Sequence, residues 1–144
     1  MKDTFIKWFM AINILLLRLS HGRIGNKLGS QTILILHTRG RKSGQDHAIP
    51  IAYFEYENLY LIVASNWGKD QQANWYLNLK KDPHAKLEVK GKTVSAAARE
   101  AQGEEYAHLW KFAVEHHPPY ADYQENTSRR IPIMVFEPSL EEMK

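Results

Sequence analysis

The residues best suited to chemistry lie in one short stretch, His37-Thr-Arg-Gly-Arg-Lys-Ser-Gly44, which follows an apolar run and precedes Ile49-Pro50. Gly40 and Gly44 permit backbone conformations that other residues rarely adopt, so that several amides can face one ligand. The Arg-Lys-Ser run at 41–43 adds two positive charges and a hydroxyl. The stretch predicts a phosphate-binding turn; a solvated basic hairpin turn is the alternative that the local sequence leaves open.

A second candidate segment is Val63-Ala-Ser-Asn-Trp-Gly68, followed by Asn74-Trp-Tyr-Leu-Asn-Leu79. Small, aromatic and amide side chains that leave a strand and enter a helix suit a planar heteroaromatic ligand. Trp75 can pack against a ring, while Ser65 and Asn66 can hydrogen-bond its heteroatoms. The alternative is that Trp-Tyr-x-x-Leu, at helical spacing, belongs to the core.

The elements that must position these residues follow from the hydrophobic pattern and from its turn residues. The continuous apolar run at 32–37 predicts a strand buried on both faces, and Pro132 predicts an edge or a bulge in the last strand. Hairpins outnumber crossovers, so we expect an α+β fold, a mostly antiparallel barrel with helices at its periphery. The pattern predicts strands at 32–37, 47–55, 59–65, 86–89, 93–99 and 130–136, and helices at 70–80, 103–116 and 120–126.

An apolar, amphipathic helix is predicted near the start of the chain, at residues 5–19, within an N-terminal segment of residues 1–25. It is too short to span a bilayer, which needs about 20 apolar residues. Two interpretations remain: a lid packed on the domain, or a segment at residues 1–20 that lies in a membrane interface. Residues 26–144 are expected to form a single domain.

Composition excludes several classes of protein. The 144 residues are 44% hydrophobic, which is enough for one real core. The net charge is only +3 and the basic residues are scattered, so nucleic-acid binding is not expected. The chain has no cysteine, which excludes disulfides and thiolate ligands and fits a cytoplasmic location. Its seven histidines include no H-E-x-x-H, and no metal site is predicted.

Five motifs taken in order resemble the deazaflavin-dependent nitroreductase family, of split β-barrel flavin-reductase type, and the resemblance runs from about Ile33 to Pro138. The motifs are His-Thr-Arg-Gly-Arg-Lys-Ser-Gly-Gln at 37–45, Ala-Ser-Asn at 64–66, Asn-Trp-Tyr-Leu-Asn-Leu at 74–79, Tyr-Ala-Asp-Tyr-Gln at 120–124 and Arg-Ile-Pro-Ile at 130–133. The resemblance implies a split barrel that binds coenzyme F420, a deazaflavin with a phospholactyl-glutamate tail. It also implies hydride transfer from the reduced cofactor to an electron-poor acceptor such as a quinone, an enone or a nitro compound.

The same resemblance assigns site residues. Tyr120, Tyr123 and Ser65 are the expected catalytic residues, which contact the acceptor. The expected cofactor-binding residues are Arg41, Lys42, Ser43, Gly44, His47, Ile49, Pro50, Ile51, Ala52, Val63, Ala64, Ser65, Asn66, Asn74, Trp75, Tyr76 and Asn78.

This chain departs from the family pattern at His47, where relatives often have arginine, at Asn66 and Trp67, where some have lysine or glycine, and at His117, where some have tyrosine. Two rival functions stay open: a reductase of the same fold that uses FMN or FAD, and a non-enzymatic protein that binds or carries the cofactor. We also expect a homodimer, and a cytoplasmic location that becomes peripheral at the inner face of the membrane if the first helix lies in the interface.

Overall fold

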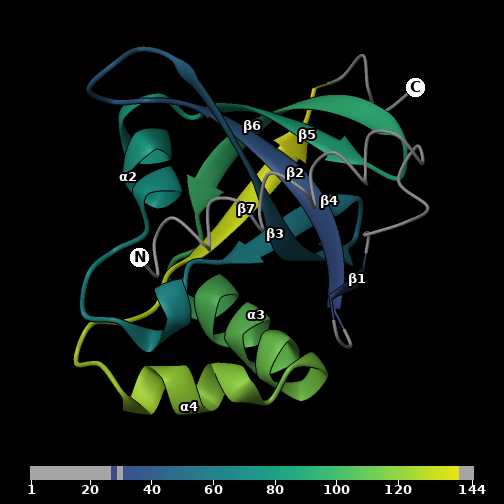
Figure 1. The fold of residues 1–144 in the computed structure, drawn as a ribbon. Helices are drawn as coiled ribbons and strands as arrows, with labels where there is room; N and C mark the ends of the chain where they lie inside the picture. Colours follow the sequence, from purple (N-terminus) through teal and green to yellow (C-terminus); the bar gives the residue numbers. More distant parts are fainter. Residues whose placement is uncertain (1–26, 29–30, 140–144) are drawn as a thin grey trace.

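The strands and helices of the computed structural model are arranged as in Figure 1, and the model describes residues 27–28 and 31–139. The helix expected near the start of the chain lies outside the described residues. In chain order the elements are β1 (Lys27–Leu28), β2 (Gln31–Arg39), β3 (Asp46–Tyr56), β4 (Leu59–Val63), the 3-10 turn η1 (Asn66–Gly68), α2 (Asn74–Lys81), β5 (His84–Val89), β6 (Lys92–Glu100), α3 (Gly103–His116), α4 (Pro119–Glu125) and β7 (Ile133–Pro138).

Antiparallel pairing of β2 to β7 forms a closed barrel in the strand order β2-β3-β4-β7-β6-β5, completed where β5 pairs with β2. The short strand β1 pairs with the start of β2. Two hairpins turn through two residues each, at Glu57-Asn58 and Lys90-Gly91, and all four residues have positive φ. Such turns match the right-handed twist of the strands they join. The expected antiparallel split barrel is confirmed.

The core has two main parts, because the strands present alternate side chains to opposite faces. One part fills the barrel, where Leu34, Leu36 and Phe136 are completely buried and α2 adds its own apolar side chains. The other lies between the barrel and the helices α3 and α4, below the sheet in Figure 1. Ile33 and Ile35 on the opposite face of β2 are also buried, so the predicted burial of this strand on both faces is confirmed.

Several bounds of the predicted elements were wrong, since the strand expected at 59–65 ends at Val63 and the strand expected at 130–136 runs from Ile133 to Pro138. Helix α2 begins at Asn74 and not at Asp70, because Ala73 is still extended and the Asp70 carboxylate accepts a hydrogen bond from Thr127 Oγ1 at 2.7 Å. The last strand is not at an edge, since β7 pairs with both β4 and β6. Pro132 precedes its first residue and therefore removes no hydrogen bond from the ladder.

Candidate functional site

The turn between β2 and β3 is closed by its own backbone. Gly40 N–H donates to Gln45 O at 2.8 Å, and Gly44 N–H donates to Gly40 O at 2.9 Å. A Cβ at position 40 would lie 2.6 Å from His47 Nε2 and 2.7 Å from Ser43 Oγ. These two side chains therefore gather directly over Gly40, in space that only a glycine leaves open. Gly44 has φ +71°, a conformation that other residues rarely adopt. The turn thus requires glycine at position 40 for lack of space and at position 44 for its backbone conformation.

Arg41 ties this turn to α2. Its backbone N–H and its Nη1–H both donate to Asn78 Oδ1, at 3.1 and 2.9 Å, and its Nη2–H donates to Asn74 Oδ1 at 3.3 Å. Asn78 is only 5% exposed and donates on to Thr38 Oγ1 at 3.3 Å, while Lys81 Nζ donates to Arg41 O at 2.9 Å. Arg41, Asn74 and Asn78, all expected to contact the cofactor, hydrogen-bond one another and hold the turn in place.

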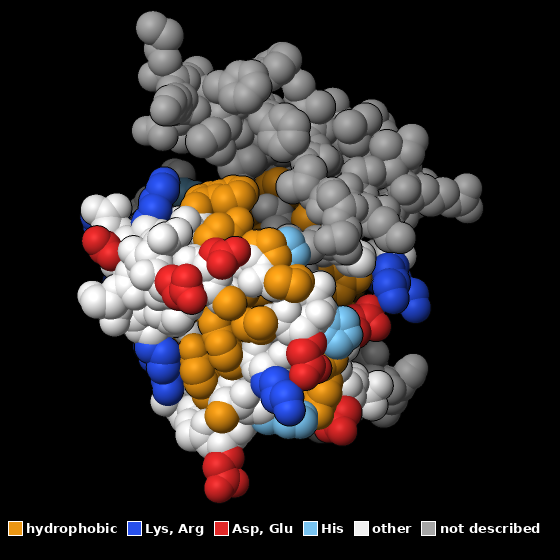
Figure 2. Space-filling view, turned by 90° about the horizontal axis from the view of Figure 1, so that it is seen from below, with side chains coloured by type: hydrophobic (Ala, Val, Ile, Leu, Met, Phe, Trp, Pro, Cys, Tyr) orange, Lys and Arg blue, Asp and Glu red, His pale blue; other side chains and the backbone are white. Residues whose placement is uncertain are grey.

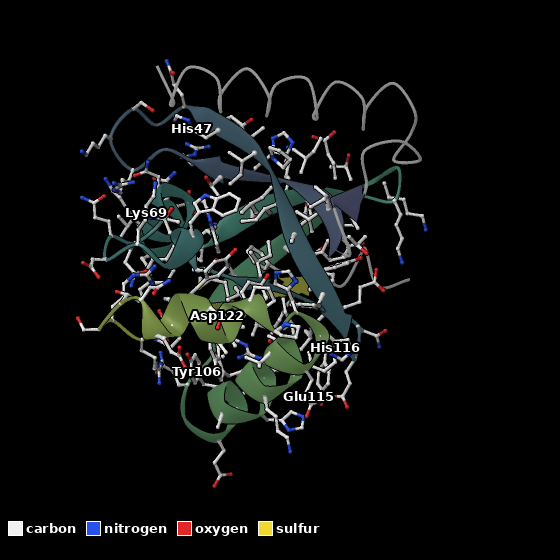
Figure 3. The ribbon with its side chains drawn as sticks, turned by 60° about the horizontal axis from the view of Figure 1, so that its bottom comes forward. His47, Lys69, Tyr106, Glu115, His116 and Asp122 are labelled. Atoms are coloured by element: carbon white, nitrogen blue, oxygen red, sulfur yellow. The ribbon has the colours of Figure 1, made fainter. Side chains whose placement is uncertain are left out.

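Residues 42–47 of the turn are all exposed, and Lys42, Ser43, Gly44 and His47 are the expected cofactor-binding residues among them. The imidazole of His47 lies 3.4 Å from Ser43 Oγ. Figure 3 shows His47 near the start of β3, directly after this turn. An ammonium, a hydroxyl and an imidazole on one turn are the donor set that an anion requires, so these residues fit a phosphate-bearing tail.

Arg129 organises the loop between β4 and α2. Its Nε–H donates to Lys69 O at 2.8 Å and its Nη2–H to Ser65 O at 2.7 Å, and its Nη1–H donates to Gln72 Oε1 at 3.0 Å. A fourth, longer bond runs from Nη1–H to Ala64 O at 3.4 Å. One partly buried guanidinium thus holds the segment in which Ser65 and Asn66 were expected to contact the cofactor ring. Burial lowers the pKa of Arg129 from its usual value.

The turn η1 packs against α4. A Cβ on Gly68 would lie 3.0 Å from Tyr123 Cα and 3.0 Å from Tyr123 O, so the two backbones are in close contact. Figure 3 shows the same junction, where Lys69 follows η1 and Asp122 belongs to α4. This contact brings the expected acceptor residues Ser65 and Tyr123 to one end of the barrel.

Tyr120 and Tyr123 are placed differently. Tyr120 is 5% exposed, and its ring makes edge contacts with Phe54, His117 and Tyr123 at centroid separations of 6.2, 4.8 and 6.2 Å. Tyr123 is half-buried. Burial lowers the pKa of His117, so its neutral form is favoured beside these rings. Tyr120 therefore supports the wall that carries Tyr123.

The remaining expected residues divide by burial. Trp75 and Tyr76 are each only 8% exposed and lie in the barrel core, as does Ala64. Tyr76 Oη also donates to Glu100 Oε1. Val63 is buried in the second part of the core, beneath α3 and α4. Ile49, Pro50, Ile51 and Ala52 on β3 are half-buried. They alternate between the two faces of the strand, so that Ile49 and Ile51 pack against the barrel core and Ala52 packs against Ile33 and Ile35.

Sequence reasoning missed Arg129, the residue that holds the loop. Its four acceptors are carbonyl or amide oxygens of residues 57 to 65 positions earlier in the chain. A local pattern carries no signal for such a contact. The only indication was an arginine pair at 129–130 just before the apolar last strand.

A groove of about 730 Å³ runs from the β2–β3 turn along β2, β5 and β6, and its lining includes Gly44 and Asp46. His37 bridges it, with its ring nitrogens bound to Asp46 Oδ2 at 3.0 Å and to Glu88 Oε2. Within residues 27–28 and 31–139 no group of three or more histidine and acidic side chains is arranged to hold a metal ion. No helix of that same part of the chain is long and apolar enough to cross a membrane.

Charges of both signs are interspersed on the face that α3 and α4 form (Figure 2). Hydrophobic side chains run between them, and this face carries no continuous basic stripe of the kind that nucleic-acid binding requires.

Comparison with known proteins gives consistent matches over most of the chain. A family model described as F420H(2)-dependent quinone reductase matches residues 10–138. A protein of Mycobacterium tuberculosis (strain H37Rv) named F420H(2)-dependent quinone reductase is 37% identical over 120 residues, which are 81% of this chain and 80% of that protein.

Two solved structures match as well. An F420-H2 dependent reductase named FDR-A has a TM-score of 0.67 and 40% identity, covering 73% of this chain and 93% of that chain. A structure described as a domain-swapped dimer has a TM-score of 0.71 and 33% identity, covering 95% of this chain and 100% of that one.

Proposed function

The chain belongs to the F420H(2)-dependent quinone reductase family, and on that premise we propose that it transfers a hydride from reduced coenzyme F420 to a quinone. Reduced F420 supplies the hydride when it is bound, and the quinone needs one further proton to become a hydroquinone. The work left to the protein is to bind both molecules, align them and exclude water. The observation that carries the proposal is the family match together with the donor set on the β2–β3 turn.

The tail of F420 binds at the β2–β3 turn in this proposal. Lys42, Ser43 and His47 supply the charge and the hydrogen bonds in this proposal, while the Gly44 N–H is used to close the turn. Arg41 has a positioning role, because its guanidinium is bound to two asparagines of α2. The exposed carboxylate of Asp46, which ends the turn, lies 3.0 Å from His37 Nδ1. The turn therefore offers net positive charge to an anion.

The half-buried part of β3 at residues 49–52 and the loop after β4 lie beside the ring of the cofactor in this proposal. The Ser65 carbonyl is bound by Arg129, which fixes the residue and leaves its hydroxyl for the ligand. Ser65 and Tyr123 are the groups that hydrogen-bond the acceptor and stabilise its developing negative charge. Tyr120 packs behind Tyr123 and holds its ring in place.

Steady-state oxidation of F420H2 by menadione, followed through the absorbance of the regenerated cofactor, tests this function. We expect saturable turnover, and we expect fluorescence titration to show tight binding of F420 and weak binding of FMN. Tight FMN binding without F420 binding, or F420 binding without turnover by any quinone, enone or nitroaromatic compound, would contradict the proposal.

We also propose that the protein forms a homodimer and that residues 1–20 contact a membrane surface. A relative described as a domain-swapped dimer supports the first statement. Sedimentation velocity tests the dimer, and a monomer at micromolar concentration argues against it. Liposome flotation of the full chain and of a chain lacking residues 1–20 tests the second, which fails if flotation persists after the deletion. A cytoplasmic location stays a prediction.

A further inference from the structure

Trp67 is the exposed large hydrophobic residue among the described residues, with 69% of its surface accessible. Burying an aromatic side chain of this size is favourable, so folding leaves one in solvent only where packing is prevented or where a ligand covers it. Trp67 lies in the middle of η1, between Asn66 and Gly68, and the backbone of Gly68 is in close contact with that of Tyr123.

The backbone at Trp67 is strained. Trp67 has φ 62° and ψ 22°, and its neighbours Asn66 and Gly68 have φ 47° and 76°. Three consecutive residues are thus left-handed, and only one of them is a glycine. A bulky side chain is uncommon in this region, and such outliers persist where the surroundings impose them. A glycine at position 67 would adopt this conformation without a steric penalty.

The surroundings do impose this conformation. Gly68 N–H donates to Ser65 O at 2.9 Å and Lys69 N–H donates to Asn66 O at 3.1 Å. The Asn66 side chain donates to Gln71 O at 2.8 Å, and Arg129 binds the carbonyls on both sides of the turn. These contacts hold the backbone of the turn on both sides, while the indole of Trp67 stays outside the core.

The position of this indole relates it to the acceptor. Ser65, two residues before it, carries one of the groups assigned to the acceptor, and Gly68, one residue after it, touches the backbone of Tyr123, which carries the other. An indole face is rich in electrons, whereas a quinone ring is poor in them, so the two stack favourably face to face.

We infer that Trp67 is a specificity-determining residue that stacks on the planar quinone and that the left-handed turn holds it there. This inference rests on the proposed function and adds to it one contact with the acceptor. Stacking does not depend on where the substituents of the ring lie, so Trp67 selects for flat, electron-poor rings and not for one particular quinone. Non-planar acceptors such as a simple aliphatic enone gain little from it.

The test compares Trp67→Gly, Trp67→Phe and Trp67→Ala with Trp110→Phe, which changes a tryptophan on α3 that stacks on Tyr106. Calorimetric titration of menadione into protein saturated with oxidised F420 measures binding without turnover. We expect Kd to rise about five- to tenfold in the glycine and alanine variants and about twofold or less in the phenylalanine variant, the range that aromatic stacking provides. Trp110→Phe should leave Kd unchanged.

Thermal unfolding supplies the second readout. Trp67→Gly should raise Tm by about 2 to 4 °C, because it removes backbone strain and little buried surface. Weaker quinone binding combined with higher stability is a pattern that a residue with a merely structural role does not produce. In steady state KM for menadione should rise more than kcat falls.

Two results are decisive. In the first, the wild type reduces menadione, and Kd and KM for menadione are the same in Trp67→Gly and Trp67→Ala as in the wild type. This result overturns the role of Trp67 and leaves the proposed function intact. A wild-type protein that neither binds nor reduces any quinone overturns the proposed function and this inference together.

Discussion

Replacing Arg129 by alanine should loosen the loop that carries Ser65, with a large loss of stability for a single residue outside the core. The side chain donates to two backbone carbonyls at 2.7 and 2.8 Å and to Gln72 Oε1 at 3.0 Å. All of these acceptors lie between the end of β4 and the start of α2, so the loss of one side chain removes several bonds to a single loop.

The magnitude follows from these bonds. Hydrogen bonds to a charged group contribute about 1.5 to 3 kcal/mol each, but the bonds of one partly buried side chain are not additive. We therefore expect the free energy of unfolding to fall by about 3 kcal/mol in Arg129→Ala, which in a chain of this length lowers Tm by about 10 °C.

Arg130→Ala is the matched control, since Arg130 is the neighbouring arginine and is exposed. Its guanidinium lies 4.0 Å from the ring centroid of Tyr106 and 3.9 Å from a Glu100 oxygen. Exposed contacts of these two kinds contribute about 1 kcal/mol together.

The assay is urea unfolding of both variants, combined with amide hydrogen exchange. The amides of Gly68 and Lys69 are hydrogen-bonded within the turn and should exchange faster in Arg129→Ala only. The reasoning is refuted if the free energies of unfolding of the two variants differ by less than about 0.5 kcal/mol, which is the usual effect of a surface substitution. It is also refuted if these amides exchange as slowly as in the wild type.

Three further predictions concern the turn and the barrel. Gly40→Ala places a methyl group 2.6 Å from the nearest side-chain atom, so the turn must shift and the Kd for F420 should rise about tenfold. Gly44→Ala has open space around its Cβ. It should lower stability by about 1 kcal/mol because of its φ of +71°, and it should change F420 binding less. Equal Kd values for the two variants would contradict the steric argument. Lys42→Ala should weaken F420 binding about fivefold at low salt, with a smaller effect as ionic strength rises. If the affinity changes neither with the substitution nor with salt, Lys42 does not bind the anion. Burial and the bond to Glu100 raise the pKa of Tyr76 to about 12, above the unfolded value of 10.0, so this stabilisation is complete below that unfolded pKa and is lost as pH rises through the folded one. Unfolding free energy measured across this alkaline window should fall more steeply in the wild type than in Tyr76→Phe, and parallel curves would argue against the shift.

Most of the fold could be predicted because its signals are local. Alternation and continuous apolar runs indicated the strands, and the pattern of α3 from Gly103 to His116 predicted its exact bounds. The errors came from contacts between distant segments. Asp70 is a residue type that often begins a helix. Its carboxylate instead accepts a hydrogen bond from Thr127, and the helix begins four residues later, at Asn74.

The candidate site shows the same division. The glycines and the basic run of the β2–β3 turn indicated anion binding, and the exposed Lys42, Ser43 and His47 agree with that reading. The division of labour inside the turn was not predictable. Arg41 and Lys42 are adjacent and both basic, but only Arg41 meets the two asparagines of α2, which pack against it in the folded chain.

By itself the sequence determined the strand pattern, the antiparallel class and the kind of ligand, because turn residues, apolar periodicity and clustered charge act over a few positions. The tertiary structure alone decided which charges are free to bind and which are already bound. Arg129 and the loop after β4 lie up to 65 residues apart, and barrel closure brings them together. The left-handed turn at Trp67 likewise depends on those long-range bonds, since an isolated chain would relax it.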